Sequence, residues 1–166
     1  KQLEEVGIRV KIDDREDETL GFRINKWELR GVPLRAEVGE REVENEDLTV
    51  VRRDSGEKSQ VKRAGAGSQI LLLLSQIQQA LLTQAQEFLD ENTHEVGGFE
   101  QFKKIMTEKR GFIKAFWCER AECEAEIKAK TKATTRVLPL DAIEEVGVCV
   151  GCGEKAKHRW IFAQAY

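Results

Sequence analysis

Four cysteines are the residues of this sequence whose type and spacing point most directly to chemistry. They form two short pairs, Cys118-x4-Cys123 and, after a gap of about 25 residues, Cys149-x2-Cys152. Zinc is held by four ligands in a tetrahedron, and two short cysteine loops from distant parts of a chain supply such a set well. Gly151 lies inside the second pair, where the backbone freedom of glycine suits a tight turn around a metal. The spacing therefore predicts a zinc site with four thiolate ligands.

The cysteines also admit other interpretations. They could be buried free thiols, although this leaves their pairing unexplained. Cys149 and Cys152 could be a redox pair, but the strand before it and the helix after it that are typical of thioredoxin-like pairs are not predicted. His158 could replace one cysteine as a ligand. A zinc ion with four protein ligands has no open coordination position, so the metal is expected to be structural and not catalytic.

A second set of residues suggests nucleic-acid binding. In GFRINKWELRGVPLR, residues 21–35, the positions Phe22, Lys26 and Arg30 share one helix face. A ring flanked by cations suits single-stranded RNA, whose bases stack on aromatic side chains while cations hold the phosphates. Glu28 adds a carboxylate that can accept hydrogen bonds from N1 and N2 of guanine, and Arg35 follows on the next strand. Periodicity alone favours the alternative, a solvated helix face with the two aromatic rings of this segment in the core.

Other nucleotide-binding and catalytic motifs are not supported. Gly65-Ala66-Gly67 lacks the third glycine of a dinucleotide-binding loop and the Gly-Lys-Ser/Thr of a phosphate-binding loop, so it is expected to be a flexible linker. The two histidines, His94 and His158, are not accompanied by a nucleophile and a carboxylate in a pattern that predicts a hydrolase.

Composition limits the class of protein. The 166 residues are 40% hydrophobic, which is enough for one medium domain or two small ones. The net charge of -3 gives no overall attraction to nucleic acid or to an acidic membrane, so RNA would need a local basic patch. No apolar run approaches the roughly 20 residues of a membrane helix, and the acidic N-terminal residues do not resemble a signal peptide. We therefore expect a cytoplasmic protein with reduced thiols and no membrane partner.

The elements that must position these residues follow from apolar periodicity. The first third is predicted to contain a strand, a helix, a second strand and a β-hairpin, over residues 8–12, 20–30, 32–38 and 48–62. Residues 62–68 are expected to be a linker, with Ser68 as the cap of the next helix. That helix is predicted over about residues 68–92. Its apolar stripe is widened by several leucines, so we expect it to be covered on more than one side: Leu71, Leu72, Leu73 and Leu82.

The last third is predicted to be a small α+β region. A helix ending at Gly111 carries Phe99, Phe102 and Ile105 or Met106 on one face. Short strands are predicted at residues 112–117, 135–138 and 159–164, with the four cysteines between them.

These segments also resemble a known family. GFRINKWELRGVPLRAEVG and VVRRDSGEK are similar to the anticodon-binding domain of prolyl-tRNA synthetase of the archaeal and eukaryotic type, and the similarity continues through ENTHEV, the cysteine pairs and the terminal FAQAY. The resemblance implies an α/β fold. Residues 1–66 would be a partial class II anticodon-binding domain, a mixed sheet with flanking helices. Residues 67–166 would be a small α+β zinc-binding domain, with a linker helix at about residues 68–92.

The resemblance implies roles for individual residues. Those expected to face the anticodon of proline tRNA, whose second and third letters are guanine, are Trp27, Glu28, Arg30 and Arg35. Further candidates for contacts with the RNA backbone are Lys26, Arg52 and Arg53. The zinc ligands would be Cys118, Cys123, Cys149 and Cys152, and Tyr166 would lie near the active site of the family's catalytic domain.

The resemblance also implies that parts of the enzyme precede Lys1, namely the catalytic domain and the first strand and helix of the anticodon-binding domain. ATP and magnesium are expected only through that catalytic domain, so this chain alone should be inactive. The expected partners are proline tRNA, the remainder of the synthetase chain and, for the full-length enzyme, a second subunit.

Two other functions fit the same residues. One is a freestanding zinc-containing RNA-binding or regulatory protein built from the same domains, and the other is a protein-interaction module based on the zinc unit. A reading frame that continues upstream of Lys1 into class II catalytic motifs would favour the synthetase over both.

Overall fold

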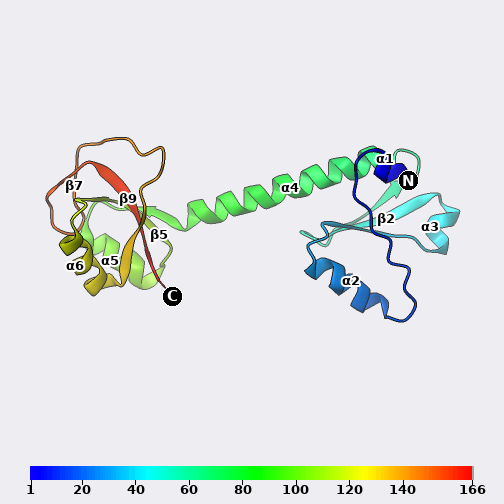
Figure 1. Ribbon diagram of the computed structural model, residues 1–166, viewed down its shortest axis with the longest axis horizontal. Helices are drawn as coiled ribbons and strands as arrows, with labels where there is room; N and C mark the ends of the chain where they lie inside the picture. The colour runs from blue at the N-terminus through cyan, green and yellow to red at the C-terminus, as the bar shows by residue number, and fades with distance from the viewer. Residues whose placement is uncertain (166) are drawn as a thin grey trace. The chain divides into compact units, whose positions relative to one another are not determined.

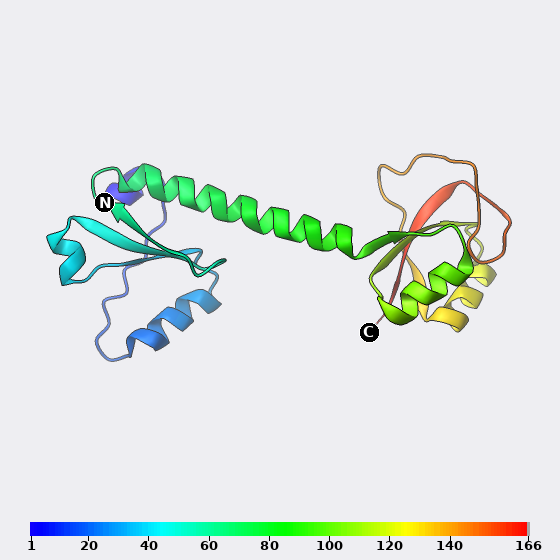
Figure 2. The same cartoon turned by 180° about the vertical axis from the view of Figure 1, so that it is seen from behind.

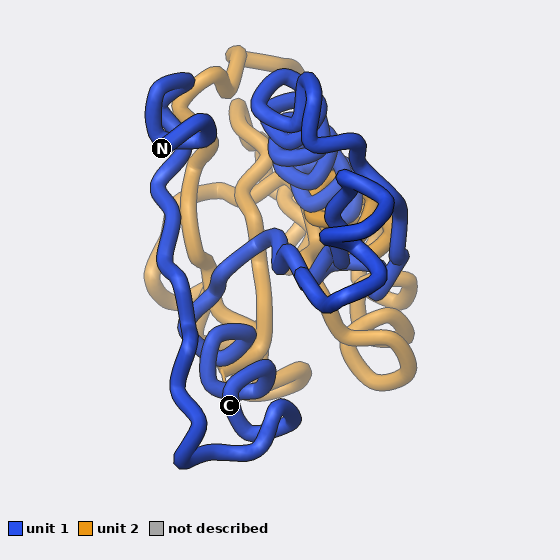
Figure 3. The backbone as a smooth tube through the Cα atoms, turned by 90° about the vertical axis from the view of Figure 1, so that its right-hand side faces the viewer, with its two compact units in different colours: residues 1–84 blue, residues 85–166 orange. Residues whose placement is uncertain are grey.

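The computed structural model describes residues 1–165, which form two compact units (Figures 1 and 3). The first unit extends from residue 1 to residue 84, and the second begins at residue 85. Each unit has its own β-sheet and its own hydrophobic core, so the expected α/β class is confirmed. Within the described residues, no helix combines the length and the apolar composition that crossing a membrane requires.

The first unit contains a three-stranded antiparallel sheet with helices around it (Figure 2). Its strands, in the order β1-β2-β3, are Leu34–Glu37, Asp47–Arg52 and Lys58–Lys62. Its helices are α1 (Gln2–Glu5), α2 (Leu20–Leu29), α3 (Glu40–Glu44) and the first part of α4 (Ala66–Glu91). The predicted helix, the second strand and the hairpin are thus confirmed, and Gly56, at φ +71°, forms the hairpin turn.

The core of the first unit lies between the sheet and the start of α4. Val50 and Val61 of the sheet are buried together with Ala66 and Ile70 of the helix. On the other side of the sheet lies α2, none of whose residues is buried (Figures 1 and 2). Burial of apolar surface therefore fixes α4 to the sheet, whereas α2 depends on polar contacts.

The predicted strand over residues 8–12 is wrong, because these residues form neither a strand nor a helix. A strand needs a neighbour to satisfy its backbone groups, and in the described sheet β1 and β3 pair only with β2. Ile8 packs against the core of the first unit, but Ile12 is 74% exposed. The alternation of apolar and polar residues was therefore not enough to form a strand, because no neighbouring strand pairs with these residues.

Helix α4 begins at Ala66, earlier than predicted, because Ala66 is buried in the core and Gly65, at φ +85°, forms the turn before it. Ser68 is not the cap: its hydroxyl lies inside the first turn and donates to the Gly65 carbonyl at 3.0 Å. The expected cover on more than one side is also wrong. Leu72 is 60% exposed, and the buried residues of the helix are Ala66, Ile70 and Ile77.

The second unit contains a four-stranded mixed sheet in the order β4-β5-β9-β6. These strands are Thr93–Glu95, Phe112–Trp117, His158–Gln164 and Ala133–Val137. The β4 and β5 strands are parallel, and β9 is antiparallel to both of its neighbours. A separate two-stranded ladder joins β7 (Gly147–Val148) to β8 (Lys155–Ala156). The three strands predicted in this region are confirmed.

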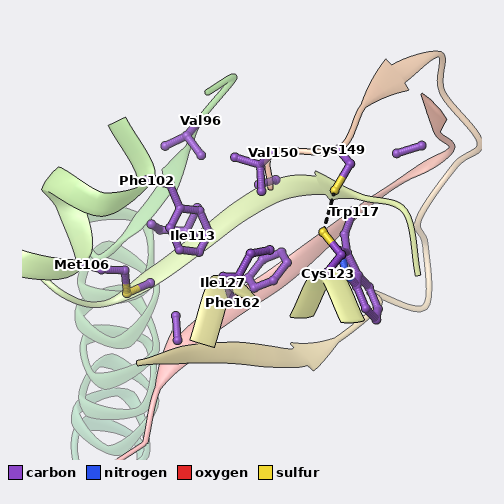
Figure 4. Close-up of a cluster of buried hydrophobic side chains, with 13 residues drawn as sticks. Val96, Phe102, Met106, Ile113, Trp117, Cys123, Ile127, Cys149, Val150 and Phe162 are labelled. Atoms are coloured by element: carbon purple, nitrogen blue, oxygen red, sulfur yellow. Dashed lines mark hydrogen bonds between the residues drawn. The ribbon is translucent and has the colours of Figure 1, made fainter. Parts of the chain in front are cut away.

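Two helices, α5 (Phe99–Glu108) and α6 (Ala121–Thr131), pack beside this sheet. The sequence predicted α5 but not α6, whose buried face has only Cys123, Ile127 and Thr131. The core between helices and sheet combines aliphatic side chains with the aromatic rings of Phe102, Trp117 and Phe162 (Figure 4). Phe102 and Phe162 meet edge to face, with ring centroids 5.3 Å apart.

Candidate metal centre and nucleic-acid interface

The first cysteine pair of the second unit lies where β5 gives way to α6. Cys118 directly follows the last residue of the strand, and Cys123 is in the first turn of the helix. Only Glu119 and Arg120 separate Cys118 from the first helical residue, so the chain reverses direction sharply here. This reversal lets a C-x4-C segment present both thiols to one point.

The second cysteine pair lies in the loop that connects β7 to β8. The N–H of Cys149 donates to the Glu154 carbonyl at 2.7 Å, and the N–H of Gly153 donates to the Cys149 carbonyl at 2.9 Å. These bonds close a tight loop. The N–H of Val150 fastens the loop to β5 by donating to the Phe116 carbonyl at 2.9 Å. The two cysteine pairs are therefore joined through β5.

Two glycines allow the loop between β7 and β8 to lie close to β5 and α6. A Cβ atom on Gly151 would lie 2.9 Å from the Cys123 sulfur and 3.0 Å from Ile127. A Cβ on Gly147 would lie 2.5 Å from the ring of Phe116. The sequence interpretation of Gly151 as a source of backbone freedom was therefore incomplete, because what the site requires there is the absence of a side chain. Backbone freedom is used instead at Gly153, the residue after Cys152, whose φ is +76°.

All four sulfur atoms converge. Cys123 and Cys149 have their sulfurs 3.4 Å apart, and those of Cys118 and Cys152 are 3.6 Å apart. All four lie within 4.8 Å of one another. Figure 4 shows the sulfurs of Cys123 and Cys149 facing each other at the edge of the aromatic core.

These spacings fit a tetrahedral metal site. With Zn–S bonds of about 2.3 Å, the sulfurs of a regular tetrahedron are ~3.8 Å apart. The observed separations are close to this value and far longer than the ~2.05 Å of a disulfide. The set is soft and entirely thiolate, which suits zinc. Within the described residues, this is the one group of three or more potential metal ligands whose ligand atoms converge in this way.

The electrostatics of the four thiols also favour a cation. Burial raises the pKa of Cys123, and the neighbouring Cys149 raises it further. At Cys152 burial acts in the same direction, but hydrogen bonds from the Glu154 backbone and the Arg120 guanidinium outweigh it and lower the pKa to about 6. Four thiols this close cannot all ionise unless positive charge compensates them, and a divalent metal would supply that charge.

His158, the alternative ligand, has a different partner. Its Nδ1 lies 3.1 Å from the carboxylate of Glu119. Glu119 and Arg120 are functional candidates that the sequence interpretation missed: the Arg120 guanidinium donates to the Cys152 sulfur at 3.3 Å. Their position directly after Cys118 was the available signal, because it keeps both residues close to a candidate ligand.

In the first unit, the structure joins two of the predicted RNA-binding residues directly. The carboxylate of Glu28, on α2, and the guanidinium of Arg35, on β1, form an ion pair with a 2.8 Å contact. Arg35 also pairs with Glu37 at 2.8 Å. The Glu28 side chain is 45% exposed, so this polar cluster is accessible to a ligand.

Trp27, on α2, and Arg30, the residue that caps the end of this helix, lie together. The Arg30 guanidinium is 5.1 Å from the centroid of the Trp27 ring. The indole N–H of Trp27 donates to the Asp13 carboxylate at 2.6 Å. Trp27 is half-buried and Phe22 is 55% exposed, and neither belongs to the core of the first unit. The alternative that placed both aromatic rings in the core is therefore wrong.

The remaining predicted residues are dispersed. Lys26 is half-buried, and Arg53 is exposed. Arg52 is bound to Asp54 by two hydrogen bonds, of 3.1 and 2.7 Å. Tyr166 lies outside the described residues.

Asp13 is a further residue of this region that sequence reasoning missed. It accepts hydrogen bonds from the side chains of Arg15 and Trp27, and its carbonyl accepts one from Arg23. No local pattern marked it, because its partner Trp27 is fourteen residues away.

Comparisons with known proteins cover both units. Residues 1–71 match a family model described as "Anticodon binding domain", and residues 99–166 match one described as "Prolyl-tRNA synthetase, C-terminal". Proteins named proline–tRNA ligase are similar along the chain. Those of Natranaerobius thermophilus, Flavobacterium johnsoniae and Rubrobacter xylanophilus are each 42% identical, over 96%, 99% and 100% of this chain. The chain spans 33%, 34% and 34% of their respective lengths, about one third of each.

Proposed function

We propose that this chain is the tRNA-binding portion of a proline–tRNA ligase. Its residues 1–71 match the anticodon-binding domain, and its residues 99–166 match the C-terminal domain of prolyl-tRNA synthetase. The observation that carries this proposal is the 42% identity to proline–tRNA ligases over essentially the whole chain. The full-length enzyme would join proline to its tRNA with ATP and magnesium in a catalytic domain, and would act as a homodimer in the cytoplasm. This portion would select the tRNA and catalyse nothing by itself.

Recognition of the anticodon would centre on the ion pair between Glu28 and Arg35. The guanidinium contacts one carboxylate oxygen of Glu28 at 2.8 Å and holds the carboxylate in place. The other oxygen can accept a hydrogen bond from N1 or N2 of a guanine, the base expected at the second and third anticodon positions. Trp27, with Arg30 stacked on it, offers a flat surface for a base. Lys26, Arg52 and Arg53 would contact phosphates.

This proposal can be tested with an anticodon stem-loop of proline tRNA titrated at fixed salt. We expect Glu28→Ala and Arg35→Ala each to weaken binding by about 1 to 3 kcal/mol, the usual cost of losing a base contact. The effects should not be additive, because each residue holds the other. Arg41→Ala, which removes an exposed cation on α3, is the control and should have little effect.

A second stem-loop, with the two guanines replaced by adenines, tests the role of the carboxylate. Wild-type protein should bind it more weakly than the proline stem-loop, and Glu28→Ala should reduce that difference. Equal affinity of wild type and both variants for the proline stem-loop would contradict the assignment.

We propose further that Cys118, Cys123, Cys149 and Cys152 bind one structural zinc ion. The spacing of their sulfurs, their thiol chemistry and the room left by Gly151 support this. Zinc would supply the positive charge that lets the four thiols ionise, and the protein would hold it in a closed site. Elemental analysis should find about one zinc per chain.

We also propose that the enzyme is of the archaeal and eukaryotic type. The three relatives named above are bacterial, so the type would describe the architecture of the protein and not its source. The C-terminal match and the convergent cysteines support this part of the proposal.

A further inference from the structure

Glu119 has an unusual backbone conformation for its residue type. It is the first residue after Cys118, and its φ is +61°, in the left-handed region that costs a residue with a Cβ conformational free energy. Glycine would adopt this conformation without that cost. A glutamate here needs surrounding contacts that hold it in place.

The side chain of Glu119 makes those contacts. One carboxylate oxygen accepts hydrogen bonds from Nδ1 of His158 at 3.1 Å and from the indole N–H of Trp160 at 3.2 Å. Both partners belong to β9. His158 is the register partner of Trp117, and Trp160 meets Trp117 edge to face with centroids 5.1 Å apart. The carboxylate, although its side chain is 49% exposed, is therefore anchored to β9 beside Trp117.

This anchor acts on both sides of Glu119 in the sequence. On one side it fixes the backbone that carries Cys118, whose sulfur lies 3.6 Å from that of Cys152. On the other side it directs Arg120 across the site, where the guanidinium donates to Cys152 at 3.3 Å. Cys118 and Cys152 are the two less buried cysteines, so packing holds this side of the site less than it holds Cys123 and Cys149.

We propose that Glu119 is a positioning residue for the metal site. Its carboxylate clamps the Cys118–Arg120 segment to β9 and so sets the geometry of the partly exposed half of the four-thiolate centre. This inference rests on the proposed zinc site. The spacing of the cysteines in the sequence does not predict this role for Glu119, because its partners are 39 and 41 residues away.

Three variants of Glu119 separate the effect of its carboxylate from the effect of its backbone conformation. Glu119→Gly removes the clamp but tolerates the left-handed conformation, Glu119→Ala removes the clamp and keeps the strain, and Glu119→Gln retains an acceptor oxygen. Glu122→Ala is the matched control, because it removes the same charge from an exposed position beside Cys123 without removing a hydrogen bond to β9.

The first measurement is zinc affinity, by competition with a chromophoric chelator. Loss of an outer-shell contact typically lowers metal affinity by about 10- to 100-fold. We expect losses in this range for the alanine and glycine variants, a smaller loss for glutamine and none for Glu122→Ala. Wild-type affinity in the glycine variant would overturn the proposal, because only the backbone conformation would then matter.

Two spectroscopic measurements report on the local geometry of the site and do not change with a general loss of stability. Cobalt(II) in place of zinc should give altered thiolate-to-metal absorption bands in the alanine and glycine variants, and unchanged bands in Glu122→Ala. In the zinc-bound protein, the indole N–H signal of Trp160 should shift in Glu119→Gln and not in Glu122→Ala.

These measurements distinguish the two proposals. If wild-type protein binds neither zinc nor cobalt(II), the zinc proposal fails, and the positioning role for a metal fails with it. If wild type binds zinc and all Glu119 variants bind it equally well, only the positioning role is overturned.

Discussion

At the scale of single residues, Asp13 shows how a segment without regular structure can hold an exposed helix. Residues 8–18 contain no helix or strand, yet the Asp13 carboxylate joins Arg15, at 2.9 and 2.8 Å, to Trp27 of α2, at 2.6 Å. Because α2 has no buried residue, such polar contacts fix its orientation and thereby the position of Glu28. The proposed base-reading residues therefore depend on a carboxylate outside their own helix.

This arrangement predicts a pH dependence. Hydrogen bonds from Arg15 and then from Trp27 hold the pKa of Asp13 well below its ordinary value. In the unfolded chain the pKa is about 3.9, so the folded state binds this proton more weakly. Asp13 should therefore contribute stability above about pH 3.9, and the contribution should be lost as the pH falls further, toward the lowered pKa.

The measurement is the free energy of unfolding of wild type and Asp13→Asn as a function of pH. The difference between them should be constant from pH 7 to pH 5 and should shrink only below about pH 3.9. A difference that vanishes already between pH 7 and pH 5 would contradict a lowered pKa of Asp13 in the folded protein.

At the scale of elements, α4 has a buried beginning and an exposed remainder. Ala66 and Ile70 are 4% exposed and belong to the core of the first unit, whereas Leu82 and Phe88 are 47% and 68% exposed. The same apolar periodicity runs through both parts of the helix. Periodicity therefore predicts the helix but does not say which part of its stripe has a partner.

Substitutions in α4 should reflect this division. Ile70→Ala should lower the free energy of unfolding of the first unit by about 2 to 4 kcal/mol, because it removes buried methyl groups and leaves a cavity. Leu72→Ala, the matched control at an exposed position, should change it by less than about 0.5 kcal/mol. Urea unfolding followed by the NMR signal of the Trp27 indole N–H measures both. Equal costs would mean that Leu72 is packed in solution.

At the scale of the whole molecule, two separate cores divide the stability. The core of the first unit is a small aliphatic cluster around Val50 and Val61, and that of the second unit is aromatic and includes Cys123 and Cys149. A structural metal contributes its binding free energy to the folding of the domain that holds it. Stability of the second unit should therefore depend on zinc, and that of the first should not.

We expect Cys149→Ser to lose the zinc and, with it, the fold of the second unit. Zinc-finger peptides gain about 10 to 16 kcal/mol from structural zinc, which is as large as the total stability of a small domain. In two-dimensional NMR, signals from the second unit should collapse to unfolded positions while those from residues 1–84 persist. Wild-type protein treated with a chelator is the control and should behave in the same way. A folded second unit without metal would contradict the structural role of zinc.

Much of the fold could be predicted because its signals are local. Helices α2, α4 and α5 follow from apolar spacing, and the β2–β3 hairpin from two strand patterns around Asp54-Ser55-Gly56. The four cysteines that converge could also be predicted from spacing, since two short cysteine pairs suggest a candidate ligand set before any fold is known. The resemblance of the quoted segments then indicated the kind of enzyme, which the comparisons support at the level of both domains.

The tertiary structure decided which of these local features have partners. It left residues 8–12 without a neighbouring strand, exposed most of the leucines of α4 and paired Glu28 with Arg35. It also joined Glu119 to His158 and Trp160, which are 39 and 41 residues away. Helices α2, α4 and α5 and the two cysteine pairs could be predicted from the sequence alone, because their signals lie in neighbouring residues. Strand pairing, burial and the contacts around the four cysteines depend on distant segments, which only the folded chain brings together.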